Sequence, residues 1–159
     1  MTEALARAVL DAARGRRAMI ATAESCTGGL IAAAITDIAG SSEVFDRGFV
    51  TYSNAAKRDL LGVPPELIER EGAVSEAVAR AMAEGALAAS AATLAVSVTG
   101  VAGPGGGSPQ KPIGLVWLAT AMRGEPTRAT KRRFGEVGRA TVRLEATRAG
   151  LRLLLERLV

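Results

Sequence analysis

The sequence predicts an α/β fold, a three-layer α/β/α sandwich with a mixed sheet of about five strands, organised as one domain over residues 1–159. Two observations predict it. Short apolar or β-branched runs alternate with longer segments of helical periodicity, the pattern typical of α/β proteins. The composition, 48% hydrophobic but only 3% aromatic, supplies small residues that let helices pack closely on a sheet. A chain of this length is able to bury a sizeable core.

The elements of the first half follow from periodicity and from capping residues. In order, we expect a helix over Thr2–Arg17, a strand over Ala18–Ala23, a helix over Cys26–Ala39, a strand over Phe45–Ser53, a helix over Ala55–Leu61 capped by Asn54, and a helical turn from Pro65 to Glu71.

The second half contains the two most apolar strands, which are expected at the centre of the sheet. In order, we expect a helix over Ser75–Ala92, a central strand over Thr93–Thr99, a loop over Gly100–Pro112, a central strand over Ile113–Ala121, an exposed strand over Thr127–Phe134, and a helix over Val137–Leu158. The loop contains five glycines and three prolines and has the length usually kept for function.

The absence of histidine narrows the possible chemistry. Ser-His-Asp catalysis and histidine-containing zinc sites are excluded, so an enzymatic base has to be a carboxylate, a lysine or a tyrosine. With one cysteine, neither an internal disulfide nor a cysteine metal cluster is expected, and we expect no metal and no cofactor. We expect a cytoplasmic protein, because no leader with a basic start, an apolar stretch and a small-residue cleavage site opens the chain. We expect no transmembrane segment, because no apolar run approaches the ~20 residues of a membrane span.

The net charge of +4 comes from basic residues concentrated late in the chain. No aromatic side chains are interleaved with them to stack on bases, so we do not expect a nucleic-acid partner. A solvated face together with a small anionic ligand is the preferred explanation.

The segment from Glu24 to Gly29 is the junction between a strand and a helix. Such a turn presents free backbone N–H groups and the positive end of a helix dipole, which favours an anion. Ser25 is either a nucleophile or ligand contact, or only the N-cap of the helix. Gly28 and Gly29 either let a phosphate approach the backbone or only let the helix pack closely on the sheet.

Lys57 is either an ordinary surface lysine or a base. If Asn54 is the N-cap, Lys57 lies in the first helical turn, where the dipole disfavours a cation and lowers the pKa. A neutral amine can take a proton from a serine hydroxyl. Tyr52 is either a half-buried strand residue or a proton relay, and Arg139 and Arg143, one turn apart, face either solvent or one anion.

Six ordered motifs covering nearly the whole chain resemble the CinA C-terminal domain family. They are Ala23–Gly29, Gly40–Ser42, Gly48–Lys57, Gly72–Ser75, Thr99–Pro104 and Lys111–Trp117. The resemblance implies an α/β/α sandwich with a mixed sheet. It also implies hydrolysis of the carboxamide of nicotinamide mononucleotide to nicotinic acid mononucleotide and ammonia, by a serine and a lysine without a metal. The alternative is a nucleotide-binding or competence-associated module without turnover.

The resemblance also implies roles for individual residues. Lys57 matches the family lysine and Tyr52 the family tyrosine, as base and as an aid to proton transfer. Ser42 and Ser25 both fall in family motifs. We expect Ser42 to be the nucleophile, because it ends a helix beside the strand that bears Tyr52, and Ser25 to contact or orient the ligand.

The remaining expected contacts bind the substrate. Thr99 is expected to hold the carboxamide and Arg139 the phosphate. Backbone N–H groups near Gly28 or Gly100 are expected to stabilise the oxyanion, with Thr27 and Gly29 in the same anion-binding turn. We expect a homo-oligomer, because small apolar residues are abundant on the surface.

Overall fold

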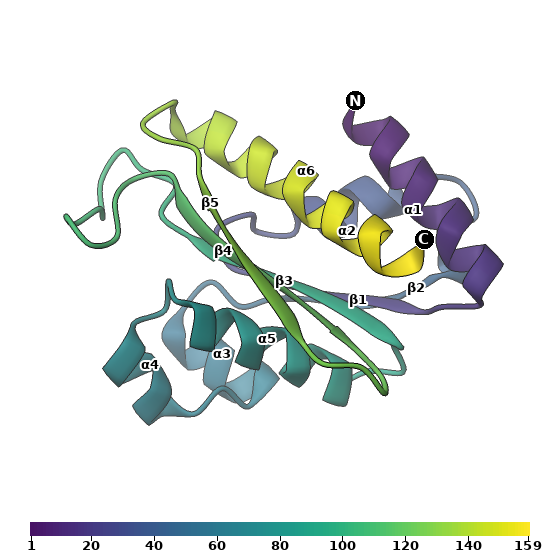
Figure 1. Ribbon diagram of the computed structural model, residues 1–159, viewed down its shortest axis with the longest axis horizontal. Helices are drawn as coiled ribbons and strands as arrows, with labels where there is room; N and C mark the ends of the chain where they lie inside the picture. The colour runs from purple at the N-terminus through teal and green to yellow at the C-terminus, as the bar shows by residue number, and fades with distance from the viewer.

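The computed structural model describes residues 1–159 as a five-stranded sheet covered by helices on both faces (Figure 1). The strands are β1 Ile20–Glu24, β2 Phe45–Val50, β3 Leu94–Gly100, β4 Leu115–Met122 and β5 Arg128–Arg133. Their order across the sheet is β2-β1-β3-β4-β5. Strand β1 is parallel to both of its neighbours, whereas β3–β4 and β4–β5 are antiparallel pairs. The predicted mixed sheet and three-layer sandwich are confirmed.

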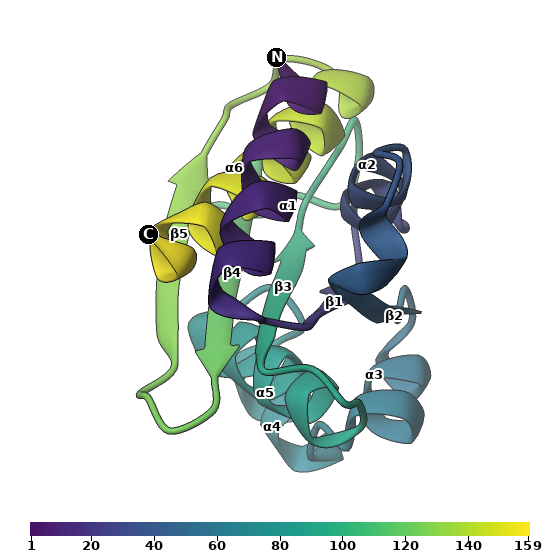
Figure 2. The same ribbon diagram turned by 90° about the vertical axis from the view of Figure 1, so that its right-hand side faces the viewer.

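Two groups of helices cover the two faces of the sheet, as Figures 1 and 2 show. Helices α1 (Thr2–Arg16), α2 (Leu30–Thr36) and α6 (Arg139–Leu158) lie on one face, and α3 (Asn54–Leu61), α4 (Pro65–Glu71) and α5 (Glu76–Ala88) lie on the other. A single 3-10 turn, η1, spans Ser41–Glu43. None of these helices has the length and apolar character needed to cross a lipid bilayer.

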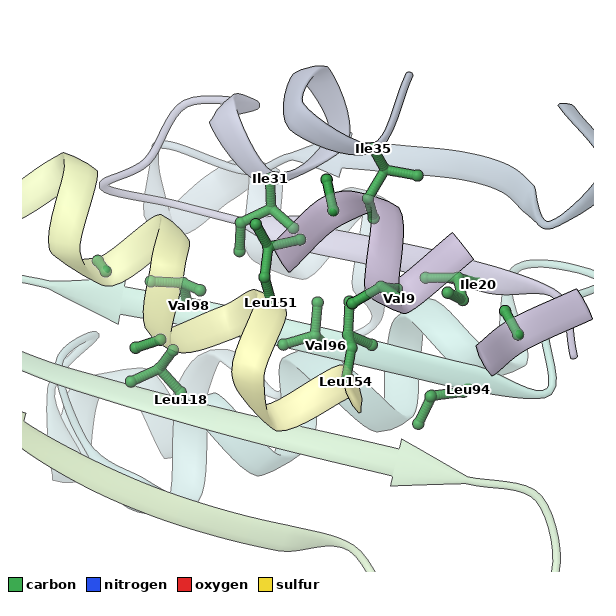
Figure 3. Packing of buried hydrophobic residues seen from close by; sticks show 14 of the residues in the cluster. Val9, Ile20, Ile31, Ile35, Leu94, Val96, Val98, Leu118, Leu151 and Leu154 are labelled. Carbon is green, nitrogen blue, oxygen red and sulfur yellow. The ribbon is translucent and has the colours of Figure 1, made fainter. Parts of the chain in front are cut away.

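The larger core lies between the sheet and helices α1, α2 and α6 (Figure 3). It contains aliphatic side chains from the sheet and from these three helices, among them Val9, Ile31, Val96, Leu151 and Leu154. All five residues of β1 and six of the seven in β3 are buried, as expected for strands covered on both faces. These two strands are therefore covered on both faces over nearly their whole length.

Helix α5 packs on the second face through small residues, as its sequence predicts. Ala79 and Ala83 lie against Ala119 and Ala121 of β4. A methyl group added at Gly85 would lie 2.0 Å from the carbonyl oxygen of Leu61. Close approach of α5 to the end of α3 therefore requires glycine at this position.

Three predicted helix starts are wrong, and each has a local cause. Helix α2 begins at Leu30 rather than Cys26, because Gly28 and Gly29 adopt positive φ angles of 61° and 104°. Helix α3 is capped by Ser53 rather than Asn54, since the Ser53 hydroxyl accepts a hydrogen bond from the Ala56 N–H at 3.0 Å. Helix α6 begins at Arg139 rather than Val137, because Gly138, with a φ of 97°, precedes it as the N-cap.

Candidate active site

A cavity of about 300 Å³ opens at the carboxyl ends of β1 and β3. Five segments form its wall: the turn after β1, the β2–α3 connection with the start of α3, the α4–α5 connection, the glycine loop after β3 and the start of α6. The lining residues include Ser25, Cys26, Tyr52, Asn54, Lys57, Thr99, Gly100 and Arg139. The carboxyl edge of parallel strands is where ligands bind in open α/β sheets, so this cavity is the natural candidate site.

The ε-amino group of Lys57 is the central feature of the cavity. Lys57 is only 1% exposed, which excludes the interpretation of an ordinary surface lysine. Its Nζ lies 2.9 Å from the Oγ of Ser25 and 2.8 Å from the carbonyl oxygen of Thr51. A longer contact of 3.5 Å joins it to the carbonyl oxygen of Tyr52. The amine therefore meets a serine hydroxyl and two carbonyl acceptors, but no carboxylate.

Burial lowers the pKa of Lys57 from 10.5 to about 8, because an ammonium ion loses its hydration inside the protein. A lowered pKa was expected from the sequence, but the expected cause was the dipole of the helix that carries Lys57. In the structure the dominant cause is desolvation. A substantial fraction of the amine is neutral near pH 8 and is able to accept a proton.

The serine beside Lys57 is Ser25, not Ser42. Ser42 is exposed in η1, which precedes β2, whereas Tyr52 follows β2. A six-residue strand extends about 20 Å, so Ser42 lies at the opposite end of the sheet from the cavity. Ser42 was expected beside the strand that bears Tyr52, but it precedes that strand and Tyr52 follows it. Ser25 is therefore the serine that lies within hydrogen-bond distance of Lys57.

The turn after β1 is occupied by the chain's own carboxylate. Buried Glu24 accepts hydrogen bonds from the Thr27 hydroxyl at 2.6 Å and from the N–H groups of Ile31 and Ala32 at 2.9 and 3.0 Å. These donors were expected to face an external anion. Thr27 instead faces Glu24, and neither Thr27, Gly28 nor Gly29 lines the cavity. The carboxylate of Glu24 therefore occupies the position where an external anion was expected.

No role was expected for Glu24 from the sequence. The sequence does contain a feature that indicates its role: a carboxylate lies directly before a glycine-containing turn, and the Thr27 hydroxyl follows three residues later. Such a pair is positioned to satisfy the first N–H groups of a following helix.

Two arginines at the start of α6 have different roles, although they lie one helical turn apart. Arg139 lines the cavity and donates hydrogen bonds to the Tyr52 hydroxyl at 2.8 Å and to the Gly103 carbonyl oxygen at 2.9 Å. Arg143 instead donates to the carbonyl oxygens of Cys26 and Thr27 at 3.0 and 3.3 Å. Arg139 is thus placed to meet an anion in the cavity, and Arg143 holds the Ser25 turn from outside.

Thr99 and Gly100 lie at the end of β3, and both line the cavity. The Thr99 hydroxyl donates to the carbonyl oxygen of Ala73 at 2.9 Å. A side chain at Gly100 would approach Val116 within 2.7 Å, so the backbone of the cavity floor lies directly against β4.

Cys26 follows Ser25 and also lines the cavity. Burial raises the pKa of its thiol to about 11, so the sulfur is protonated at neutral pH and is a poor nucleophile. Its backbone N–H donates to no acceptor of another residue. No group of three or more Cys, Asp or Glu side chains is arranged to hold a metal ion.

The chain is similar to several known proteins. The model of the CinA C-terminal domain matches residues 2–158. The nicotinamide-nucleotide amidohydrolase PncC of Escherichia coli (strain K12) is 52% identical over 151 residues, which cover 94% of this chain and 90% of that protein. The crystal structure of competence/damage inducible protein CihA from Agrobacterium tumefaciens is 53% identical, with a TM-score of 0.96 over 98% of this chain and 94% of that one.

Longer proteins also contain this unit. A CinA-like protein of Akkermansia muciniphila is 63% identical over 108 residues, which are 68% of this chain but 26% of that protein. The chain thus spans most of one kind of relative and about a quarter of another. The match to the family model over nearly every residue establishes that this chain belongs to the CinA C-terminal domain family.

Proposed function

We propose that this protein is a nicotinamide-nucleotide amidohydrolase, which hydrolyses nicotinamide mononucleotide to nicotinic acid mononucleotide and ammonia. The observation that carries the proposal is the buried contact of 2.9 Å between Lys57 and Ser25 in the cavity. The 52% identity to a relative bearing the name of this activity, over 94% of the chain, supports the substrate.

The first step is attack by the Ser25 Oγ on the carboxamide carbon. In its neutral form the Lys57 amine has two N–H bonds and one lone pair. The carbonyl oxygens of Thr51 and Tyr52 accept the two hydrogens, which leaves the lone pair facing Ser25. The serine proton passes to Nζ as the C–O bond forms. Lys57 is thus the general base, as histidine is in other acyl-transfer enzymes.

The negative charge that develops on the carboxamide oxygen needs hydrogen-bond donors. The backbone N–H of Cys26, the residue after the nucleophile, has no acceptor in a neighbouring residue and belongs to the cavity wall. We assign it as an oxyanion donor. The N–H of Gly28, expected from the sequence for this role, donates to the Ser25 carbonyl oxygen at 3.1 Å and is not available.

Collapse of the tetrahedral intermediate breaks the C–N bond, and the proton held on Lys57 passes to the departing nitrogen to give ammonia. An acyl ester remains on Ser25. A water molecule, deprotonated by neutral Lys57, then attacks the ester, and the proton returns to the Ser25 oxygen as nicotinic acid mononucleotide leaves. Every proton in this cycle moves through one amine.

The phosphate of the substrate is assigned to Arg139. Arg139 lines the cavity, so its guanidinium is able to pair with a phosphate there. The first turn of α6 contains no acidic residue and no side-chain cap, so the backbone N–H groups of this turn are also free to bind an anion. The hydroxyls of Tyr52 and Thr99 also lie at the cavity, and we assign them to orienting the substrate and aiding proton transfer.

We further propose a homo-oligomer acting in the cytoplasm. Exposed apolar side chains at Val50 and Leu60 support self-association, and a single buried thiol is compatible with a reducing compartment. Light scattering on the purified protein tests the assembly, and a single monomeric mass over the micromolar range contradicts it.

The decisive experiment measures ammonia released from nicotinamide mononucleotide by the wild type and by Lys57→Ala. The wild type is expected to turn over with a rate that rises with pH up to about 8, and Lys57→Ala to lose turnover while keeping its circular dichroism spectrum. Lys131→Ala, at an exposed position on β5, is the matched control. A folded wild type that binds the nucleotide without releasing ammonia would make this member a binding module instead.

A further inference from the structure

Glu24 is a buried titratable group that the proposed mechanism does not use. It is 1% exposed and lies directly before Ser25. Its carboxylate takes part in no ion pair, and it accepts hydrogen bonds from one O–H and two N–H groups. Burying a carboxylate that has no cationic partner costs free energy. The segments that its three hydrogen bonds connect therefore indicate its role.

The side chain of Glu24 connects the Ser25 turn to helix α2. The Thr27 hydroxyl, two residues after Ser25, donates to one carboxylate oxygen at 2.6 Å, and the N–H of Ile31 donates to the same oxygen. The N–H of Ala32 donates to the other. Because α2 packs into the main core through Ile31, the carboxylate ties the turn to a fixed element.

The backbone of Glu24 connects to the other half of the Ser25–Lys57 pair. Its carbonyl oxygen accepts the N–H of Thr51 at 2.9 Å, and the Thr51 carbonyl oxygen accepts from Lys57 Nζ at 2.8 Å. One residue therefore links the segment that carries the serine and the segment that orients the amine. Arg143 closes the turn on the opposite side through the carbonyl oxygens of Cys26 and Thr27.

We propose that Glu24 is a positioning residue: through Thr27 and the start of α2 it fixes the Ser25 hydroxyl at hydrogen-bond distance from Lys57. This inference rests on the function proposed for the Ser25–Lys57 pair. A displacement of the serine oxygen by about 1 Å is sufficient to lower a rate by as much as a hundredfold, so the link affects kcat. Glu24 does not line the cavity, so its loss has little effect on KM.

Substitutions of Thr27 separate positioning from simple helix capping, which Glu24→Gln does not. Glu24→Gln presents an amide nitrogen to one N–H donor and weakens both the cap and the turn, and it also risks the fold. Thr27→Val removes only the hydroxyl that reaches Glu24, with nearly unchanged volume, and leaves the bonds to Ile31 and Ala32 intact. Thr27→Ser restores the hydroxyl. The matched control is Ser97→Ala, which removes a buried hydroxyl bonded to the Ala79 carbonyl oxygen at 2.6 Å, outside the cavity.

The experiment has two readouts, each corrected for the folded fraction. One is kcat and KM for ammonia release from nicotinamide mononucleotide. The other is the rate at which a small aryl sulfonyl fluoride labels Ser25, followed by intact-protein mass. In that reaction the serine oxygen forms the S–O bond, fluoride leaves, and Lys57 takes the proton.

Thr27→Val is expected to lower both rates roughly tenfold to a hundredfold with KM within about twofold, and Thr27→Ser to recover most of the loss. Ser97→Ala is expected to lower the denaturation midpoint without changing either rate. Equal rates for Thr27→Val and Ser97→Ala, or a loss that Thr27→Ser does not restore, overturn the inference.

The labelling reaction distinguishes failure of the inference from failure of the proposed function. If the wild type is labelled at Ser25 but releases no ammonia, the substrate assignment fails and the Thr27 series is decided by labelling alone. If neither reaction occurs in the wild type, the nucleophile assignment is wrong, and the positioning role is refuted with it.

Discussion

The Nζ of Lys57 lies 2.9 Å from the Oγ of Ser25, although 32 residues separate them in the chain. Two parallel strands produce this proximity. Ser25 follows β1 and Thr51 follows β2, and the register pairs Glu24 with Val50 at the end of both strands. Helix α3 then turns Lys57 back over this edge. A lysine amine, which is usually exposed in proteins, is thereby enclosed beside a hydroxyl.

The choice of serine is directly testable. Ser25→Ala is expected to lower kcat for ammonia release roughly 10³-fold or more, because no other hydroxyl contacts Lys57. Ser42→Ala is expected to stay within about twofold of the wild type, as for most exposed substitutions. Steady-state kinetics at pH 8 decide between them. The reverse pattern would restore the role that the family motif suggested for Ser42 and would require a rearranged sheet edge.

The buried lysine should affect stability with a defined sign. The pKa of Lys57 is about 8 in the folded protein and near 10.5 in the unfolded chain, so the unfolded state binds more protons between these values. Below pH 8 both states are protonated, and the folded state bears the whole cost of the buried charge. From this group alone, the free energy of unfolding therefore rises with pH from 8 to 10.5.

Lys57→Met removes this cost. We expect the variant to gain up to about 3 kcal/mol relative to the wild type at pH 7, at 1.36 kcal/mol for each unit of pKa. The difference should shrink as the pH approaches 10.5. Urea unfolding at pH 7, 8.5 and 10 measures it, with exposed Lys131→Met as the control. A difference that does not vary over this range would show that Lys57 is not desolvated.

Arg139 is expected to recognise the phosphate and not the reacting amide. Arg139→Ala should raise KM for nicotinamide mononucleotide roughly tenfold or more, since it removes a charge-assisted contact. It should change KM for nicotinamide riboside, which has no phosphate, by less than about threefold. Parallel ammonia assays on the two substrates provide the comparison. Equal losses on both would assign Arg139 to holding Tyr52 and Gly103 in place.

Two helical glycines give opposite expectations for the same substitution. A methyl group at Gly85 would lie 2.0 Å from the Leu61 carbonyl oxygen, so Gly85→Ala should cost at least about 2 kcal/mol by forcing α5 away from α3. Gly15 is exposed in α1, and a methyl group added there would have no neighbouring atom within 4 Å. Gly15→Ala should therefore raise the free energy of unfolding by about 0.5–1 kcal/mol. Chemical denaturation of both variants measures the contrast. A neutral Gly85→Ala would mean that α5 shifts freely on the sheet.

Much of the fold follows from local patterns in the sequence. Apolar runs locate all five strands within a few residues, and Gly40, Gly62 and the glycine loop mark where elements end. Helix starts are less accurate, because a positive φ at Gly28 and Gly29 and the cap at Ser53 depend on backbone geometry that composition does not specify.

The sequence by itself determined the chemical inventory of the site: no histidine, a serine in a strand–turn–helix junction, and a lysine early in a following helix. Only the tertiary structure decided which serine meets that lysine. Periodicity tells which side chains share a face, but the end of the sheet at which a side chain lies depends on strand direction and pairing. Strand β2 has Ser42 at one end and Tyr52 at the other, so parallel pairing with β1 brings Ser25, and not Ser42, to the enclosed amine.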